Sequence, residues 1–332
     1  MASKNKNVLA GESFVEGSRS RTGHYKRSYL PRIQADVGGE VGKTGVFDTT
    51  VEPYGDIETR VNVFRGGKDR LEEKALAVQV DLSDAEKRKT YLHELSRARL
   101  LFADALYYQE ILKSLPKLST AARQQLGMVQ KQVAAGLAPE SDRLGFEIFL
   151  NNLKAEQLLQ EEDYEHARQE MKAVLGIPFD SELQLAGGAP TDFDAELLNS
   201  SLNPEENQDI LMLKRRAEIA GIQKSQEDRW WTPALDVYGG FALYTFRQIQ
   251  FSTIDERKSA FGGVNLSFQV FDGLEAKTRK RALEHQARGY ALEAEQKRRE
   301  LEALFEKLKH ELVNRRKLMA IISQNVNLGV KS

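Results

Sequence analysis

An internal repeat constrains the fold most, because a duplicated chain folds into two related halves. Two blocks of the sequence recur at fixed separations. A separation of 202 residues links Asn5, Val8, Leu9, Pro31, Ile33 and Gly38 to Asn207, Ile210, Leu211, Pro233, Leu235 and Gly240. A separation of 207 residues links Gly55, Ile57, Val63, Phe64, Gly66 and Ala75 to Gly262, Val264, Val270, Phe271, Gly273 and Ala282. The offset changes between the blocks, which indicates an insertion in a loop. We predict a first structural repeat over residues 1–204 and an incomplete second one over residues 205–332.

Each copy contains stretches in which apolar and polar residues alternate. In the first copy Ile57, Thr59, Val61 and Val63 alternate with polar residues, and Ile33, Ala35 and Val37 do the same; in the second copy the alternating residues are Val264, Leu266, Phe268 and Val270. One apolar and one polar face is typical of a half-buried strand. The prediction is therefore a β-hairpin over residues 30–64 and another over residues 233–272.

The remaining segments are predicted to be helices. Apolar residues recur at coiled-coil spacing in three stretches: Leu71, Ala75, Val78 and Leu82; Leu144, Ile148, Ala155, Leu159 and Met171; and Ile210, Leu213, Ala217 and Ala220. Gly136 suits a helix end and Pro139 a helix start. We predict helices over residues 1–29, 205–232 and 273–332, a long helical hairpin over 65–176 with its tip near 133–142, and a linker over 177–204. Pro116 is expected to kink the hairpin, and Pro233 to end the helix before it.

Composition excludes several function classes. Charged residues make up 29% of the chain and no 18-residue apolar run occurs, which excludes a transmembrane helix. A net charge of −1 gives no general attraction to nucleic acid. The chain has no cysteine, its histidines lack metal-ligand spacing, and Gly66-Gly67-Lys68 lacks the spacing of a phosphate loop. We predict no catalytic, cofactor-binding or metal-binding residues, and hence no enzyme.

Helices this long need neighbours along their length, and four strands cannot close around a space. If the apolar strand faces meet lipid, every sheet edge must be paired, so closure requires several copies; three copies give twelve strands. An aromatic cluster at the second hairpin fits a membrane-interface belt: Trp230, Trp231, Tyr238, Phe241, Tyr244 and Phe246. Alternating strands are also typical of soluble sheets, so these patterns alone leave both interpretations open.

Two motifs carry a family resemblance. Val133-x-x-Gly136-Leu137-x-Pro139-x-Ser141-Asp142, followed by a helix ending at Gly176, resembles the first repeat of the TolC-like outer membrane efflux proteins, or outer membrane factors. The segment Pro233 to Gly240, followed by Val264 to Gly273, is similar to their second-repeat strands and helix start.

The resemblance implies a mainly α fold with β, in which coiled-coil helical hairpins and two β-hairpins build a homotrimer with a 12-stranded outer-membrane barrel and a periplasmic helical tunnel. It implies a passive exit duct for drugs, toxins or proteins in a tripartite efflux or type I secretion system. The implied partners are a periplasmic adaptor (membrane fusion) protein, an inner-membrane pump and outer-membrane lipid.

The resemblance also implies two groups of site residues. The periplasmic tip, where the adaptor binds, comprises Val133, Gly136, Leu137, Ala138, Pro139, Ser141 and Asp142. The barrel–helix junctions comprise Pro31, Phe64, Gly66, Pro233, Phe271 and Gly273. Asp142 is expected near the channel constriction, or else simply as a first-turn acid favoured by the helix dipole.

The sequence departs from the family at both ends. It shows no signal peptide and no lipidated cysteine, and it stops before a second-repeat tip. We therefore expect a truncated chain. Two other interpretations remain open at this stage: a soluble coiled-coil scaffold, and an enzyme with a helical insertion.

Overall fold

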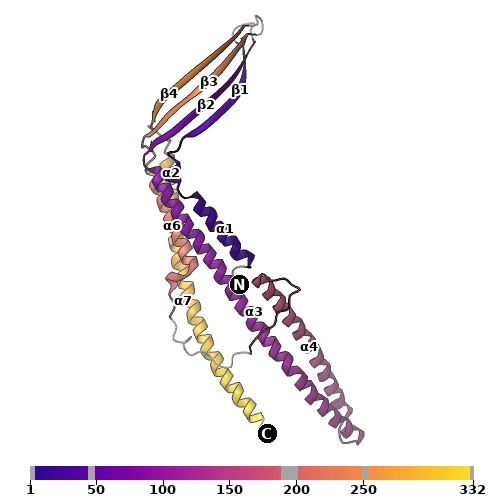
Figure 1. Ribbon diagram of the computed structural model, residues 1–332. Helices are drawn as coiled ribbons and strands as arrows, with labels where there is room; N and C mark the ends of the chain where they lie inside the picture. Colours follow the sequence, from indigo (N-terminus) through magenta and orange to yellow (C-terminus); the bar gives the residue numbers. More distant parts are fainter. Residues whose placement is uncertain (1–3, 44–48, 188–200, 249–252, 330–332) are drawn as a thin grey trace. The chain divides into compact units, whose positions relative to one another are not determined.

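The computed structural model describes residues 4–43, 49–187, 201–248 and 253–329. Its helices and strands follow one another in the order α1 (Lys6–Arg21), α2 (His24–Arg27), β1 (Arg32–Lys43), β2 (Thr49–Arg65), α3 (Lys68–Ala134), α4 (Glu140–Leu175), the short 3₁₀ helix η1 (Pro204–Glu206), α6 (Gln208–Glu227), β3 (Ala234–Gln248), β4 (Thr253–Ser267) and α7 (Glu275–Gly329) (Figure 1). Long helices with an antiparallel sheet of four strands confirm the predicted mainly α fold with two β-hairpins.

The chain divides into two compact units. One comprises Met1–Phe14, Glu86–Pro204 and Glu300–Ser332 and contains the α3–α4 tip. The other comprises Val15–Ala85 and Glu205–Arg299 and contains the sheet together with the helix ends next to it.

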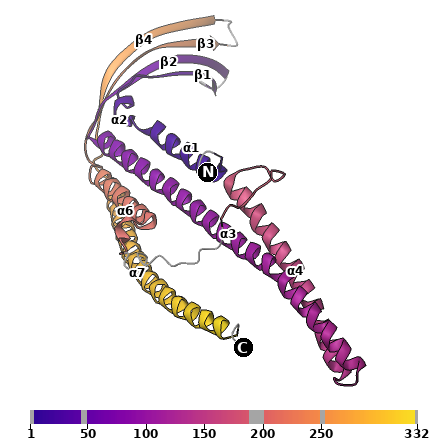
Figure 2. The ribbon, with the colours of Figure 1, turned by 60° about the horizontal axis from the view of Figure 1, so that its bottom comes forward.

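The sheet has the order β1-β2-β3-β4, with every neighbouring pair antiparallel (Figure 2). Both hairpins pair in the same register. Ala35 lies opposite Ile57 in the first hairpin, and Val237 lies opposite Val264 in the second. The repeat separations of 202 and 207 residues carry the first pair onto the second. The shared register supports the duplication, while its boundary at residues 204 and 205 stays a prediction.

An aromatic ring covers a glycine at the same place in both hairpins. A Cβ atom on Gly38 would lie 2.6 Å from the Tyr54 ring, and one on Gly240 would lie 2.7 Å from Cζ of Phe261. Only glycine leaves room for a ring to lie against the neighbouring strand at these positions.

Small and medium apolar residues form the helix contacts within each unit. In the sheet-containing unit, Ala75 and Val78 of α3 pack with Ile222 of α6. In the tip-containing unit, Ala105 of α3 packs with Ala167 and Met171 of α4. In the α3 stripe Ala75, Val78 and Leu82 are buried and Leu71 is partly buried. In the α4 stripe only Met171 is buried, while Leu144, Ile148 and Leu159 are exposed.

Two predicted helices end earlier than expected. Residues 1–29 break into α1 and α2 because Gly23 takes a left-handed conformation with φ 81°. The helix predicted over residues 205–232 ends at Glu227, and turn bonds such as Thr232 N to Arg229 O (3.2 Å) follow it. Pro233 therefore does not end the helix. It directly precedes β3, as Pro31 precedes β1.

Two further expectations concern Pro116 and the end of the last strand. Pro116 does not end a helix, because α3 runs through it from Lys68 to Ala134, and a kink at this position stays a prediction. The last strand ends at Ser267 rather than continuing through Val270. Its partner β3 begins at Ala234, so no paired strand lies opposite the residues beyond Ser267.

Candidate functional site

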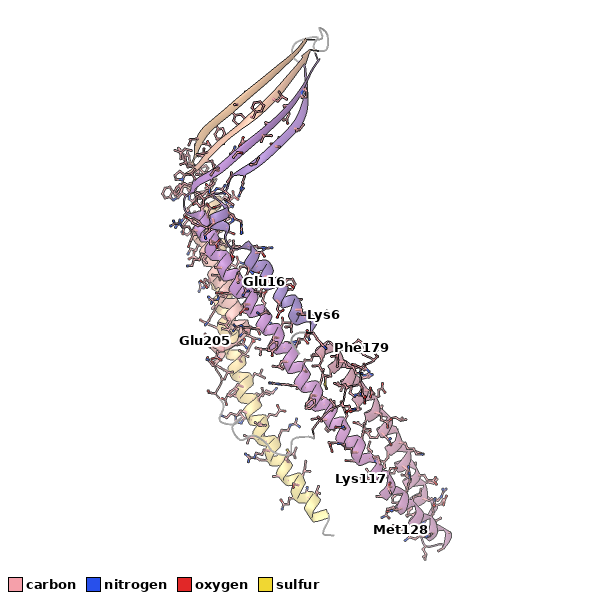
Figure 3. The ribbon with its side chains drawn as sticks, viewed as in Figure 1. Lys6, Glu16, Lys117, Met128, Phe179 and Glu205 are labelled. Atoms are coloured by element: carbon pink, nitrogen blue, oxygen red, sulfur yellow. The ribbon has the colours of Figure 1, made fainter. Side chains whose placement is uncertain are left out.

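The α3–α4 tip is a tight helical turn. The N–H of Leu137 donates to Gln132 O (2.8 Å) and that of Gly136 donates to Val133 O (3.0 Å). Gly136 has a φ of 70°, the left-handed conformation that ends helices in this way. Pro139 is extended and α4 begins at the next residue. The predicted tip residues therefore do lie together, at the end of the paired helices beyond Met128 (Figure 3).

Charge at the tip is centred on Arg143. Its guanidinium pairs with Glu140 (Nε to Oε1, 2.7 Å) and with Glu147 (2.5 Å). Arg143 holds the pKa of Glu140 below its ordinary value, and Glu140 raises the pKa of Arg143. Asp142 is exposed in the first turn of α4, where the helix dipole favours an acid. Leu137 is 80% exposed, so an apolar side chain is presented to solvent at the very end of the hairpin.

One face of the sheet is apolar and uncovered in the single chain. Alternate residues on all four strands point to this side, and Ile33, Val37 and Val264 are 71%, 90% and 66% exposed. The same face carries Ala35, Ile57, Val61, Val237, Phe241, Leu243 and Leu266, as the strand registers require. A soluble sheet of this size would bury these side chains.

The opposite face of the sheet is polar. It carries Arg32, Gln34, Asp36, Asp56, Glu58, Arg60, Asp236, Ser259 and Asn265. Arg60 pairs with Glu58 at 2.7 Å and lies over the Tyr238 ring at 5.8 Å from its centroid. In the part of the sheet formed by these residues, an apolar side is thus separated from a charged side.

The two strand-to-helix turns have the same backbone conformation. Gly66 and Gly67 have φ values of 62° and 73°, and Gly273 and Leu274, at the equivalent positions, have 69° and 68°. Glycine adopts this conformation without cost, whereas Leu274 does not. Asp272 offsets the strain, because its carboxylate accepts from the N–H groups of Leu274 (2.9 Å) and Ala276 (2.8 Å).

The first turn is also locked by its neighbours. The Arg229 guanidinium donates to Gly66 O at 2.8 Å, and a Cβ on Gly66 would overlap Thr232. Among the predicted junction residues, Gly66 is thus in contact with the segment that precedes Pro233. Phe64 and Phe271 are exposed, and no atom lies near the Cβ position of Gly273.

Sequence reasoning missed a buried polar network beside this turn. Asp69 accepts from Asn62 Nδ2 (3.1 Å) and lies 3.5 Å from His24 Nε2. Glu73 accepts from the N–H groups of Gly23 (2.8 Å) and Tyr25 (3.2 Å). The N–H of Gly23 is the main cause that lowers the pKa of Glu73. The sequence feature that could have indicated this network is the pair Asp69 and Glu73, two acids in the first turns of the helix after Gly66-Gly67.

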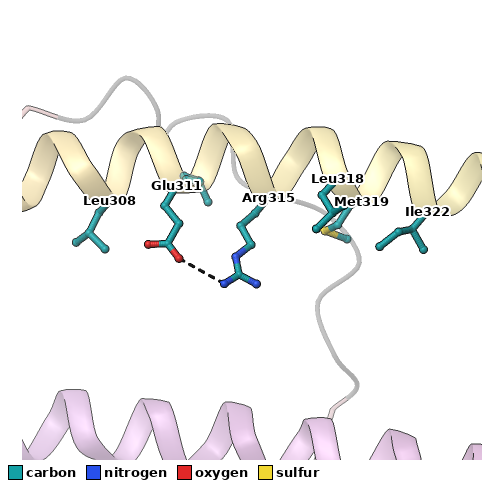
Figure 4. A pocket seen from close by; sticks show the side chains of 7 residues that line it. Leu308, Glu311, Arg315, Leu318, Met319 and Ile322 are labelled. Carbon is teal, nitrogen blue, oxygen red and sulfur yellow. Dashed lines mark hydrogen bonds and ion pairs between the residues drawn. The ribbon is translucent and has the colours of Figure 1, made fainter.

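The distal part of α7 presents an apolar stripe. Leu308, Leu312, Leu318, Met319 and Ile322 line a hollow of about 560 Å³, with an ion pair between Glu311 and Arg315 (3.4 Å) at its edge (Figure 4). Leu308, Met319 and Ile322 are each about half exposed. This stripe has the composition of a surface that packs against another helix.

No helix among the described residues is apolar over a length sufficient to cross a bilayer. Within the same residues, no three His, Cys, Asp or Glu side chains gather as metal ligands.

Solved structures match this chain, although no protein-family model and no curated protein does. A CusC structure described in terms of transmembrane channel formation superposes with a TM-score of 0.70 at 13% identity, over 96% of this chain and 75% of that chain. The outer-membrane channel OprN gives 0.70 at 16% identity, over 93% and 70%. The outer membrane protein VceC from Vibrio cholerae gives 0.68 at 13% identity, over 89% and 73%.

These structures are described as channels or outer membrane proteins rather than as enzymes, so the enzyme interpretation has no support among them. The likeness extends over most of the chain, including both its helices and its strands. The chain therefore has the fold of the TolC-like outer membrane channels, as the sequence resemblance predicted.

Proposed function

We propose that this protein is one subunit of a trimeric outer-membrane channel, a passive exit duct that extends into the periplasm. The observation that carries the proposal is the two-sided sheet. Its apolar face has no cover within the described chain, and its opposite face is charged. A barrel wall in lipid requires this division, with apolar side chains facing lipid and polar ones facing the lumen.

Burial of the apolar face favours insertion. Eight of its side chains are substantially exposed in the single chain: Ile33, Val37, Ile57, Val237, Phe241, Leu243, Val264 and Leu266. Full burial of one such side chain contributes roughly 1.5–3 kcal/mol. Because each is already partly covered, we take half of that, which gives on the order of 10 kcal/mol per chain on transfer to lipid.

Strand length and sheet edges set the number of subunits. The four strands are 12, 17, 15 and 15 residues long, and a membrane strand needs only about 9–11. The described sheet has β1 and β4 as its two edges. Unpaired edges are not tolerated in lipid, so β4 of one copy must pair with β1 of the next. Three copies close a twelve-stranded barrel.

The helices fit the same assembly. Exposed apolar residues on α4 (Leu144, Ile148 and Leu159) and the stripe on α7 are surfaces on which helices of another copy can pack. We further propose that the tip, with Leu137 at its end, meets a periplasmic adaptor and that an inner-membrane pump supplies the energy. Drugs, toxins or proteins are the proposed cargo, in tripartite efflux or type I secretion.

A conductance measurement tests the channel. Purified full-length protein is added to a planar bilayer, and stepwise current increases are expected as trimers insert. A protein that remains monodisperse without detergent and gives no current steps would refute the proposal and favour a soluble coiled-coil scaffold. As a matched pair, Ile57→Arg on the apolar face should suppress insertion, while Ser259→Arg on the polar face should not.

A further inference from the structure

Exposed apolar side chains follow the end of β4. Phe268, Val270, Phe271 and Leu274 lie in the segment that leads from Ser267 to α7, and all four are exposed. A run of uncovered apolar side chains thus connects the apolar face of the sheet with the start of α7.

Two basic residues follow this segment at the start of α7. Lys277 and Arg281 are four residues apart, which places them on one face of the helix. Both bases are exposed, and neither has a partner among the residues that the structure describes.

Neighbouring acids are already paired with other bases. Glu275 and Glu227 lie 3.6 and 3.5 Å from Arg279, and Glu284 lies 3.3 Å from Lys224. Lys280 pairs with Asp228 in the same way. The two unpaired positive charges are therefore left available to a ligand from outside the described chain.

The first repeat places bases at the same positions. The repeat separation of 207 residues relates Lys277 to Arg70 and Arg281 to Lys74, in the first two turns of α3. Arg70 extends to the Tyr25 hydroxyl (3.1 Å), and Lys74 is exposed without a partner in the described part of the chain. We call Arg70, Lys74, Lys277 and Arg281 the basic belt.

Acids next to the first pair of bases are also engaged. Asp69 accepts from Asn62, Glu72 accepts from Gln226 (2.8 Å), and Glu73 accepts from backbone N–H groups. Both turns of the repeat therefore combine satisfied acids with exposed bases. In a trimer the belt would bring twelve positive charges to one level.

We propose that the basic belt binds the phosphate groups of anionic phospholipids at the edge of the membrane. This inference rests on the proposed function, because it requires the apolar face of the sheet to meet lipid. Cations at the boundary between an apolar surface and water lie at the depth of the headgroups and are attracted to anionic lipid. Phe268, Phe271 and Leu274 supply apolar contacts for the acyl chains of the same lipid, which free phosphate lacks.

The test counts lipids bound to the full-length protein by native mass spectrometry. The two probes are phosphatidylglycerol and phosphatidylcholine with identical acyl chains, each added to protein in detergent. We expect phosphatidylglycerol to bind more tightly, with a preference that falls as salt is raised. In Lys277→Gln/Arg281→Gln its affinity should fall about fivefold per base removed, while phosphatidylcholine binding stays unchanged.

Lys309→Gln/Arg316→Gln is the matched control. It removes the same charges from exposed positions further along α7 and should leave phosphatidylglycerol binding unchanged. Lys74→Gln/Lys277→Gln provides an independent variant with one base from each repeat. Equal binding of both lipids by the wild type, or an equal loss in the control, would overturn the headgroup inference. A wild type that conducts in bilayers but shows no lipid preference leaves the channel standing, whereas one that forms no channel refutes the proposed function itself.

Discussion

The equivalent glycines Gly66 and Gly273 provide a controlled test of the strand-to-helix turns. Both have left-handed backbones, with φ values of 62° and 69°, but their surroundings differ. A Cβ atom would overlap Thr232 at the first position, and nothing lies within 4 Å at the second. Substitution by alanine therefore adds backbone strain at both positions and a steric clash at one.

The magnitudes follow from these two terms. An L-residue in the left-handed region costs about 1–2 kcal/mol. Alanine recovers part of that, about 0.4–1 kcal/mol, because it restricts the unfolded chain. Gly273→Ala should thus lower the free energy of unfolding by about 1 kcal/mol. Gly66→Ala adds the displacement of Thr232, typically about 1–3 kcal/mol for an overpacked site, and should cost about 2–4 kcal/mol.

Tryptophan fluorescence during guanidinium unfolding in detergent measures this difference. The chain has two tryptophans, Trp230 and Trp231, which are the two residues before Thr232, so the signal reports on the turn itself. Thr232→Ala in the Gly66→Ala background should recover part of the loss. If Gly66→Ala is no more destabilising than Gly273→Ala, the close packing of Thr232 on Gly66 is wrong. If both variants are neutral, the left-handed conformation is wrong.

Three further predictions concern other parts of the molecule. Ile57→Arg places a charge on the apolar face near the middle of β2 and should reduce the stability of the inserted trimer by about 2–4 kcal/mol per chain. The loss of heat-resistant trimer on gels measures this effect, and Ser259→Arg on the polar face should show no such loss. Asn5→Ala should cost more than its repeat equivalent Asn207→Ala, about 2–3 against 1 kcal/mol in thermal unfolding, because only the former breaks buried bonds to Glu94 (3.2 Å) and Val174 O (2.6 Å). The N–H of Gly23 lowers the pKa of Glu73 in the folded protein, so the ionised carboxylate stabilises the fold. This stabilisation is complete above the ordinary carboxyl pKa and is lost as the pH falls through the lowered pKa. In Glu73→Gln the free energy of unfolding, measured against pH, should lack this acid-dependent decrease.

Each of these predictions has a distinct contrary result. Equal trimer loss in the two arginine variants would mean that the sheet faces are assigned wrongly. Equal destabilisation by the two asparagine variants would mean that the contacts of Asn5 with Glu94 and Val174 add nothing to a helix cap. If the stability of Glu73→Gln depends on acid pH as that of the wild type does, the Glu73 carboxylate does not hold α2 in place.

Periodicity and repetition predicted most of the fold. The alternation from Ile57 to Val63 identified β2, and Gly136 with Pro139 located the α3–α4 tip. These elements could be predicted because their conformation is determined by residues within the same short segment. The repeat separations related one hairpin to the other, and the structure shows that the two hairpins share their register.

Features decided by distant contacts were not predictable in the same way. The end of β4 at Ser267 depends on where its partner β3 begins, although the alternation continues to Val270. The stripe of α4 has the spacing of a core, yet Leu144, Ile148 and Leu159 are exposed in the single chain. The pairing of Asp69 with Asn62 requires β2 and α3 to be placed first. Roles for the tip residues, including Asp142, stay predictions.

The number of chains in the detergent-solubilised particle tests the central claim most directly. Light scattering corrected for bound detergent gives this number for the full-length protein. The proposed channel predicts three chains, because three four-stranded sheets close one twelve-stranded barrel. A monomer in detergent, or a monodisperse dimer that needs no detergent, would contradict the closed barrel and with it the proposed function.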